Sequence, residues 1–151
     1  MIYDKKKGDF YITCFYKNLG SNYHFTKVSG TVFKVDDENG AVWRFGIAKV
    51  DNHYKVTDIA SGMAVTSWHD KKKDCLAEFE RREKVIIDKL NEAMNSDEHY
   101  RFYVLRLEEK YKEDKNVNWS NQFFYSFLNW HKIIFWSQFY ILKFNCYRRD
   151  R

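Results

Sequence analysis

Strand-like stretches fill the first half of the chain. Five of them are rich in aromatic and β-branched residues and are separated by turn residues: 10–16, 23–35, 41–50, 54–59 and 63–68. Gly30 interrupts the second stretch and indicates a bulge or a bend. The run 36–40 (Asp-Asp-Glu-Asn-Gly) predicts a hairpin, because Asn-Gly readily adopts tight turns. Trp43, Phe45 and Ile47 share one face of the third stretch. The spacing predicts an antiparallel meander with one covered face.

Apolar positions at helical spacing follow, and they are Leu76, Phe79, Ile86, Leu90, Ala93 and Met94. Glu83 is the one charged interruption of this stripe. The pattern predicts a helix over 71–95 that covers the sheet, with Ser67 and Asp70 as a capping box. A second helix is predicted after Ser96, which caps it, with the apolar stripe Tyr100, Tyr103, Val104, Leu107 and Tyr111.

The last part of the chain, 116–151, is dominated by aromatic residues. Between Phe123 and Phe144, fifteen of the twenty-two residues are apolar or aromatic. Burying one large aromatic side chain contributes about 1.5–3 kcal/mol, so this many side chains require a cover. A membrane-spanning helix is disfavoured, because Lys132 and other polar residues lie in the middle of the stretch. We therefore expect 123–142 to be a helix that lies against the rest of the fold or against a second copy in a homodimer.

The predicted fold class is α+β, with an antiparallel β-meander of about five strands packed by a long helix. A second helix and an aromatic-rich C-terminal helix follow. The chain is expected to form a single domain over 1–151, because no linker or internal repeat divides it. Within this domain, 1–69 is mainly β, 70–115 is helical, and 116–151 is the aromatic-rich helical segment.

Composition narrows the class of protein. Hydrophobic residues make up 44% and charged residues 31% of the chain, which is typical of a globular protein. The three cysteines (Cys14, Cys75 and Cys146) lie far apart, which argues against a disulfide-stapled secreted fold. The N-terminus lacks the apolar stretch of a signal peptide. These features favour a cytoplasmic protein.

No enzyme site can be recognised in the sequence. The glycine-rich loops that bind nucleotides are absent. Cys75 is the least implausible nucleophile, since it lies near a predicted helix start, but a small buried core residue is the simpler interpretation. The candidate metal ligands are His69, Asp70, Asp74 and Cys75, which are grouped at the strand–helix junction. Ligand pairs at zinc spacing are missing, so no cofactor is expected.

Charged runs are the candidate partner-binding residues. Asp36, Asp37 and Glu38 could contact a basic partner, and the basic candidates are Lys71, Lys72, Lys73, Arg148 and Arg149. The net charge is +5, and residues 116–151 hold five basic side chains and one acidic one. Basic residues mixed with aromatic ones also suit nucleic acid, which makes a nucleic-acid-binding accessory protein the alternative function. Any such binding is expected to be weak and steeply salt-dependent.

Three pieces of the sequence resemble small accessory proteins of phages and prophages of low-GC Gram-positive bacteria. They are GTVFKVDDENG (30–40), RFGIAKVDNHYKVTDIASG (44–62) and KKKDCLAEFERREK (71–84). The chain also resembles anti-CRISPR proteins in its small size and in its lack of a catalytic motif. The resemblance implies a stoichiometric inhibitor that acts in the host cytosol and binds a host or defence-system protein, such as a type II, Cas9-type effector. The predicted function is therefore a non-enzymatic protein-binding module.

Overall fold

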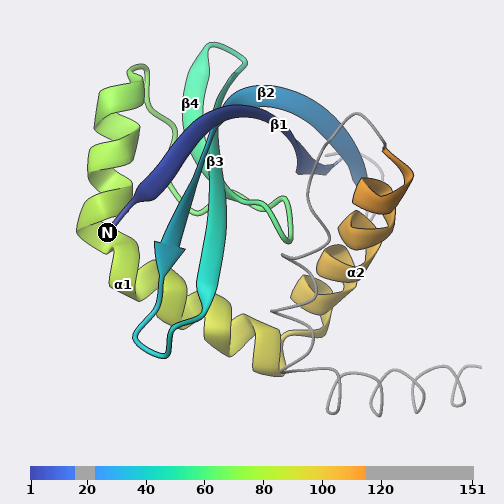
Figure 1. The fold of residues 1–151 in the computed structure, drawn as a ribbon. Helices are drawn as coiled ribbons and strands as arrows, with labels where there is room; N and C mark the ends of the chain where they lie inside the picture. The colour runs from blue at the N-terminus through green and yellow to red at the C-terminus, as the bar shows by residue number, and fades with distance from the viewer. Residues whose placement is uncertain (16–22, 115–151) are drawn as a thin grey trace, which may run out of the picture. The chain divides into compact units, whose positions relative to one another are not determined.

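A curved antiparallel sheet and two helices form the fold of the computed structural model, which describes residues 1–15 and 23–114. The elements are β1 (Tyr3–Phe15), β2 (Tyr23–Asp36), β3 (Val42–Val50), β4 (His53–Asp58), α1 (Lys72–Ser96) and α2 (Glu98–Glu113). The strands pair in the order β1-β2-β3-β4, all antiparallel (Figure 1). The predicted α+β class is confirmed for this part of the chain.

The predicted fifth strand, 63–68, does not form a regular strand. The segment lies beside β4 and makes only isolated bridges, Thr57 with Ala64 and Tyr54 with His69. Between these bridges, the Thr66 side chain accepts the Val56 N–H at 2.9 Å. The Thr66 hydroxyl thus takes the place of a backbone carbonyl as the acceptor. Threonine side chains can compete in this way with the backbone hydrogen bonds of a strand. In the described part of the chain, the sheet therefore has four strands.

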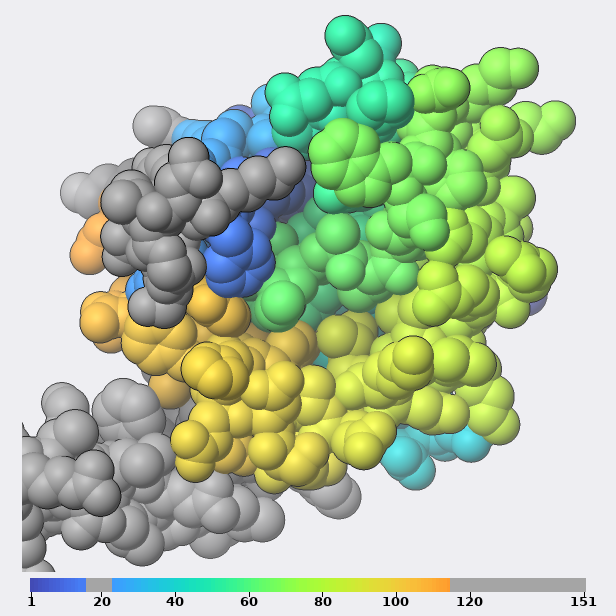
Figure 2. Space-filling view, turned by 180° about the vertical axis from the view of Figure 1, so that it is seen from behind, coloured from blue at the N-terminus to red at the C-terminus, as the bar shows by residue number. Residues whose placement is uncertain are grey.

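The sheet is strongly coiled, so that its first strand returns toward its last. β1 pairs along its length with β2, and in addition the Thr13 N–H donates to the Gly62 carbonyl at 2.9 Å. Figure 2 shows the segment between β4 and α1 (green) across the middle of one face, between α1 and the blue part of β1. The segment that follows β4 thereby covers part of the open edge of β1.

Aromatic side chains fill both sides of the sheet. On the side that α1 covers, the rings of Phe33, Phe45 and Phe79 lie 4.7–5.8 Å apart between centroids. On the other side, Phe10 is fully buried over Gly46, where an added Cβ would meet the Phe10 ring at 2.5 Å. The glycine therefore makes room for an aromatic ring in the core.

Both helix starts differ from the sequence-based expectation. The capping box of Ser67 and Asp70 is wrong, because α1 begins after Lys71, which makes no side-chain cap. The N–H and hydroxyl of Ser67 instead bind Glu78. The cap of α2 is Asp97, whose carboxylate accepts the N–H groups of the next turn, while the Ser96 hydroxyl donates back to Glu92. A carboxylate is the better acceptor at the positive end of a helix.

A buried polar network joins the end of β4 to α2. The Asp58 carboxylate is enclosed and accepts hydrogen bonds at 2.7 Å from the Tyr100 and Ser61 hydroxyls. Burial raises the pKa of Asp58 in spite of these donors. Because buried polar groups are costly when left unpaired, this network fixes the position of α2 against the turn that follows β4.

The aromatic helix predicted over 123–142 lies outside the described residues, as do Arg148 and Arg149. Within the described ranges, neither helix is long and apolar enough to cross a membrane.

Candidate binding surface

The sheet register brings two distant lysine runs together. We call them the β1 lysines (Lys5, Lys6 and Lys7) and the α1 lysines (Lys71, Lys72 and Lys73), and all six are exposed. Lys7 pairs with Thr31 across the β1–β2 ladder, and the Lys72 ammonium donates to the Thr31 hydroxyl at 2.6 Å. Thr31 is therefore the point at which the two runs meet.

Among the described residues, these six lysines make no ion pair, whereas four other lysines do. Ion pairs within the described residues engage Lys27, Lys34, Lys84 and Lys112. None of the β1 or α1 lysines takes part in an ion pair with a described residue. Their charge is therefore available to an anionic partner.

An exposed tryptophan lies three residues before the α1 lysines. The Trp68 side chain is 56% exposed, and the Lys55 ammonium stands 3.9 Å from its ring centre. The His53 ring packs against it at 5.2 Å, and His53 Nδ1 lies 2.9 Å from Asp70 Oδ1. Burial lowers the pKa of Lys55. The cation–π contact and the histidine hold the indole in place while leaving much of it open to a partner.

The segment that carries Trp68 is fastened to α1 through a buried carboxylate. Glu78 lies 2.5 Å from His69 Nε2 and 2.7 Å from the Arg82 guanidinium, and it accepts the Ser67 N–H. The hydrogen bond with His69, followed by those of Arg82 and Ser67, lowers the pKa of Glu78 to about 2. Ser67 and His69, the residues on either side of Trp68, are therefore both held by Glu78.

The four metal candidates do not converge. His69 is engaged with Glu78, Asp70 with His53, and Asp74 is exposed in the first turn of α1. Cys75 is buried, and its sulfur lies 3.4 Å from the Thr66 hydroxyl. Burial raises the pKa of the Cys75 thiol, which disfavours the nucleophilic thiolate. In the described part of the chain, no group of three or more such side chains could hold a metal ion.

The acidic side chains of the turn between β2 and β3 mostly bind other groups of the same chain. Asp37 accepts the N–H groups of Asn39 and Ala41 and the Trp43 indole N–H. Burial alone would raise the pKa of Asp37, but these bonds together lower it. Asp36 accepts the Tyr3 hydroxyl at 2.6 Å. Glu38 forms an exposed ion pair with Lys84 at 2.9 Å. The turn residues thus shape the hairpin, and the Glu38 side chain stays largely exposed in its ion pair.

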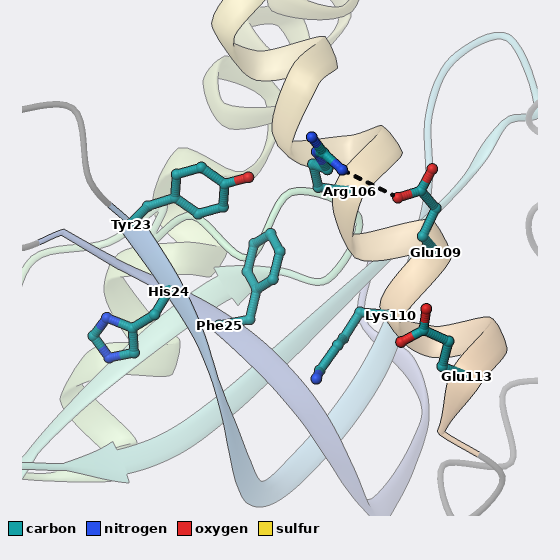
Figure 3. A pocket seen from close by; sticks show the side chains of 7 residues that line it. All are labelled: Tyr23, His24, Phe25, Arg106, Glu109, Lys110 and Glu113. Carbon is teal, nitrogen blue, oxygen red and sulfur yellow. Dashed lines mark ion pairs between the residues drawn. The ribbon is translucent and has the colours of Figure 1, made fainter.

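A hollow of about 310 Å³ lies between the start of β2 and the last turns of α2 (Figure 3). Tyr23 and Phe25 point toward the helix, whereas His24 points away from it. The other residues that line the hollow all lie on α2, and they are Arg106, Glu109, Lys110 and Glu113. Two cations and two carboxylates alternate there, and Arg106 pairs with Glu109 at 3.6 Å. Such balanced charge selects neither an anionic nor a cationic ligand.

Comparisons with protein-family models, with curated proteins and with solved structures give no match for this chain. The features that point to a partner are therefore the lysines that meet at Thr31 and the exposed Trp68 ring. The α1 lysines were identified from the sequence, but Trp68 was not. An exposed tryptophan looks like a core residue in a hydrophobicity pattern, and only the structure shows that the ring faces solvent.

Proposed function

We propose that this chain is a non-enzymatic protein-binding module, and specifically a stoichiometric inhibitor encoded by a phage or another mobile element. The observation that carries the proposal is the meeting of the two lysine runs at Thr31, with Trp68 nearby in the sequence. Tryptophan is among the residues that contribute most to protein interfaces, and surrounding charges steer and orient the partner.

The preferred partner is a defence-system protein with an acidic surface. The segments 30–40, 44–62 and 71–84 resemble phage accessory proteins, and small size without a catalytic motif is typical of anti-CRISPR proteins. Together these likenesses make a Cas9-type effector the first protein to test. The channel that holds nucleic acid in such effectors is positively charged, so a lysine-rich surface would be repelled there. We therefore expect contact at an acidic patch outside the channel, with inhibition through loading or a conformational step.

The test is a titration of the full chain against a purified Cas9–guide complex, followed by calorimetry and by DNA cleavage. We expect saturation at a fixed molar ratio and loss of cleavage at the same ratio. Replacing the three α1 lysines by alanine should weaken binding at least tenfold. The matched control replaces three exposed lysines elsewhere, Lys84, Lys89 and Lys112, and should bind as the wild type does. Absence of binding to the effector in both its loaded and free forms would reject this partner.

The alternative is a nucleic-acid-binding accessory protein, which the exposed β1 and α1 lysines and the exposed Trp68 ring also favour. Fluorescence anisotropy with labelled single-stranded DNA and RNA separates the two functions. For a protein-binding module, we expect weak binding that disappears as salt rises, because phosphate contacts release counterions. Nanomolar, sequence-selective binding at physiological salt would reverse the ranking.

A further inference from the structure

β1 is an edge strand, and its backbone alternates between two directions. Within the uninterrupted register from Lys6 to Phe15, every second residue directs its N–H and C=O groups toward β2. The Tyr11 N–H donates to the Tyr111 hydroxyl and the Thr13 N–H to the Gly62 carbonyl, and neither acceptor belongs to β2. Residues with this parity therefore direct their backbone groups away from the sheet, and Lys7 is one of them.

Among the residues that the structure describes, the outer edge of β1 is thus covered at one end and open at the other. α2 and the turn after β4 satisfy the edge at Tyr11 and Thr13. At Lys7, no hydrogen bond from another described residue engages the outward backbone groups, and residues 3–7 are exposed. An open strand edge is a template for another extended chain, which would add as a further strand.

The charge at this edge selects the kind of chain that can add. The β1 lysines lie along the open part, and Lys72 reaches the neighbouring Thr31. A second copy of the same edge would set lysines opposite lysines, which is unfavourable in a cross-strand pair. A strand with acidic side chains at alternate positions would instead place a carboxylate opposite a lysine.

We infer that the open edge of β1 around Lys7 accepts an extended, acidic segment of the protein partner as an added strand. The inference rests on the proposed protein-binding function and gives its mode of recognition. The backbone of Lys7 supplies hydrogen bonds, and the β1 and α1 lysines supply the charge preference. Nucleic acid cannot reproduce the backbone ladder, so the open edge favours a polypeptide.

The probe is a ten-residue peptide in which glutamate alternates with valine, compared with the same peptide carrying glutamine or lysine. We expect the full chain to bind the glutamate peptide at least tenfold more tightly than the other two. Hydrogen exchange reports the mode: the Lys7 amide should slow at least tenfold when the glutamate peptide is bound. If the glutamate peptide binds but the Lys7 amide exchanges as fast as before, the peptide is held by charge attraction alone, and the inference of an added strand is overturned.

Two substitutions of Lys7 separate the contribution of its backbone N–H from the contribution of its charge. Lys7→Ala keeps the N–H and removes one charge, so we expect a two- to fivefold loss of peptide affinity. Lys7→Pro also removes the N–H, which an edge strand tolerates when that group faces solvent, and should reduce affinity at least tenfold below Lys7→Ala. Equal affinity of the two variants would overturn the inference, and the exchange measurement on the wild type decides if Lys7→Pro fails to fold. If Lys7→Pro still binds the effector while the α1 lysine variant does not, the proposed function stands and the added strand is rejected.

Discussion

Gly30→Ala is expected to be among the most destabilising small substitutions in the chain. A Cβ at position 30 would lie 2.1 Å from the Ile47 carbonyl oxygen and 3.1 Å from the Ala48 Cα, both of which are backbone atoms of β3. Backbone inside a paired strand cannot move aside as a side-chain end can. β2 must therefore separate from β3 at the centre of the sheet.

The expected cost follows from two opposing terms. Replacing glycine by alanine reduces the entropy of the unfolded chain, which stabilises by about 0.4–1 kcal/mol where the site tolerates a methyl group. Overpacking costs about 1–3 kcal/mol and more where backbone must shift. We expect Gly30→Ala to lower the free energy of unfolding by about 3 kcal/mol, out of a typical total of about 5–15 kcal/mol. For a chain of this size the melting temperature would fall by about 6–12 °C.

The matched control is the cross-strand partner of Gly30, namely Gly8. There an added Cβ would meet only the Val32 Cγ2 atom, at 3.3 Å. We expect Gly8→Ala to change stability by less than about 1 kcal/mol, since a side-chain methyl can shift slightly. Urea unfolding followed by tryptophan fluorescence, together with thermal melts, measures both variants. If Gly30→Ala is as stable as Gly8→Ala, the close approach of β2 to β3 is not a property of the folded protein.

Further predictions concern the polar networks and the proposed surface. The pKa of Glu78 falls from 4.5 to about 2 on folding, so its contribution of about 1–3 kcal/mol is complete above pH 4.5 and is lost as the pH falls toward 2. Acid unfolding curves should show this loss, and Glu78→Gln should flatten it. Tyr100→Phe removes a donor to the buried Asp58 and should cost about 1–3 kcal/mol in urea unfolding. Trp68→Ala should leave the melting temperature within about 2 °C, because the ring is mostly exposed, yet weaken partner binding at least tenfold in calorimetry. Elemental analysis of the full chain should give less than one zinc per molecule, because ligand pairs at zinc spacing are missing.

Local sequence patterns predicted which segments form strands and helices more accurately than they predicted how the helices are capped. Alternation identified the covered face of β3, and helical spacing located α1 within one residue of its bounds at each end. The cap of α2 was placed one residue early, because Ser96 and Asp97 are both good caps and a preference ranking does not separate them, whereas the Asp97 carboxylate is favoured at the positive end of the helix. The fifth strand failed because the Thr66 hydroxyl competes for a ladder hydrogen bond, which strand propensity does not register.

The candidate surface was less accessible to sequence reasoning, because it depends on contacts between distant residues. Lys7 and Lys72 meet only through Thr31, and no local pattern specifies the register that joins them. Glu78 was missed as a buried carboxylate, although Arg82 four residues later is the spacing of a helical ion pair. Its second partner, His69, comes from a bridge beside β4 that the sequence does not reveal.

Gly30 links the stability of the sheet to the geometry of the proposed surface. Thr31 follows it directly, pairs with Lys7 on one side and Ile47 on the other, and receives the Lys72 hydrogen bond. A side chain at position 30 would displace β2 where the two lysine runs meet. Gly30→Ala should therefore weaken partner binding even at a temperature where the variant is fully folded, whereas Gly8→Ala should bind normally. Unchanged binding by folded Gly30→Ala would mean that the lysines act as independent solvated charges, since the register that joins them would then have no influence on recognition.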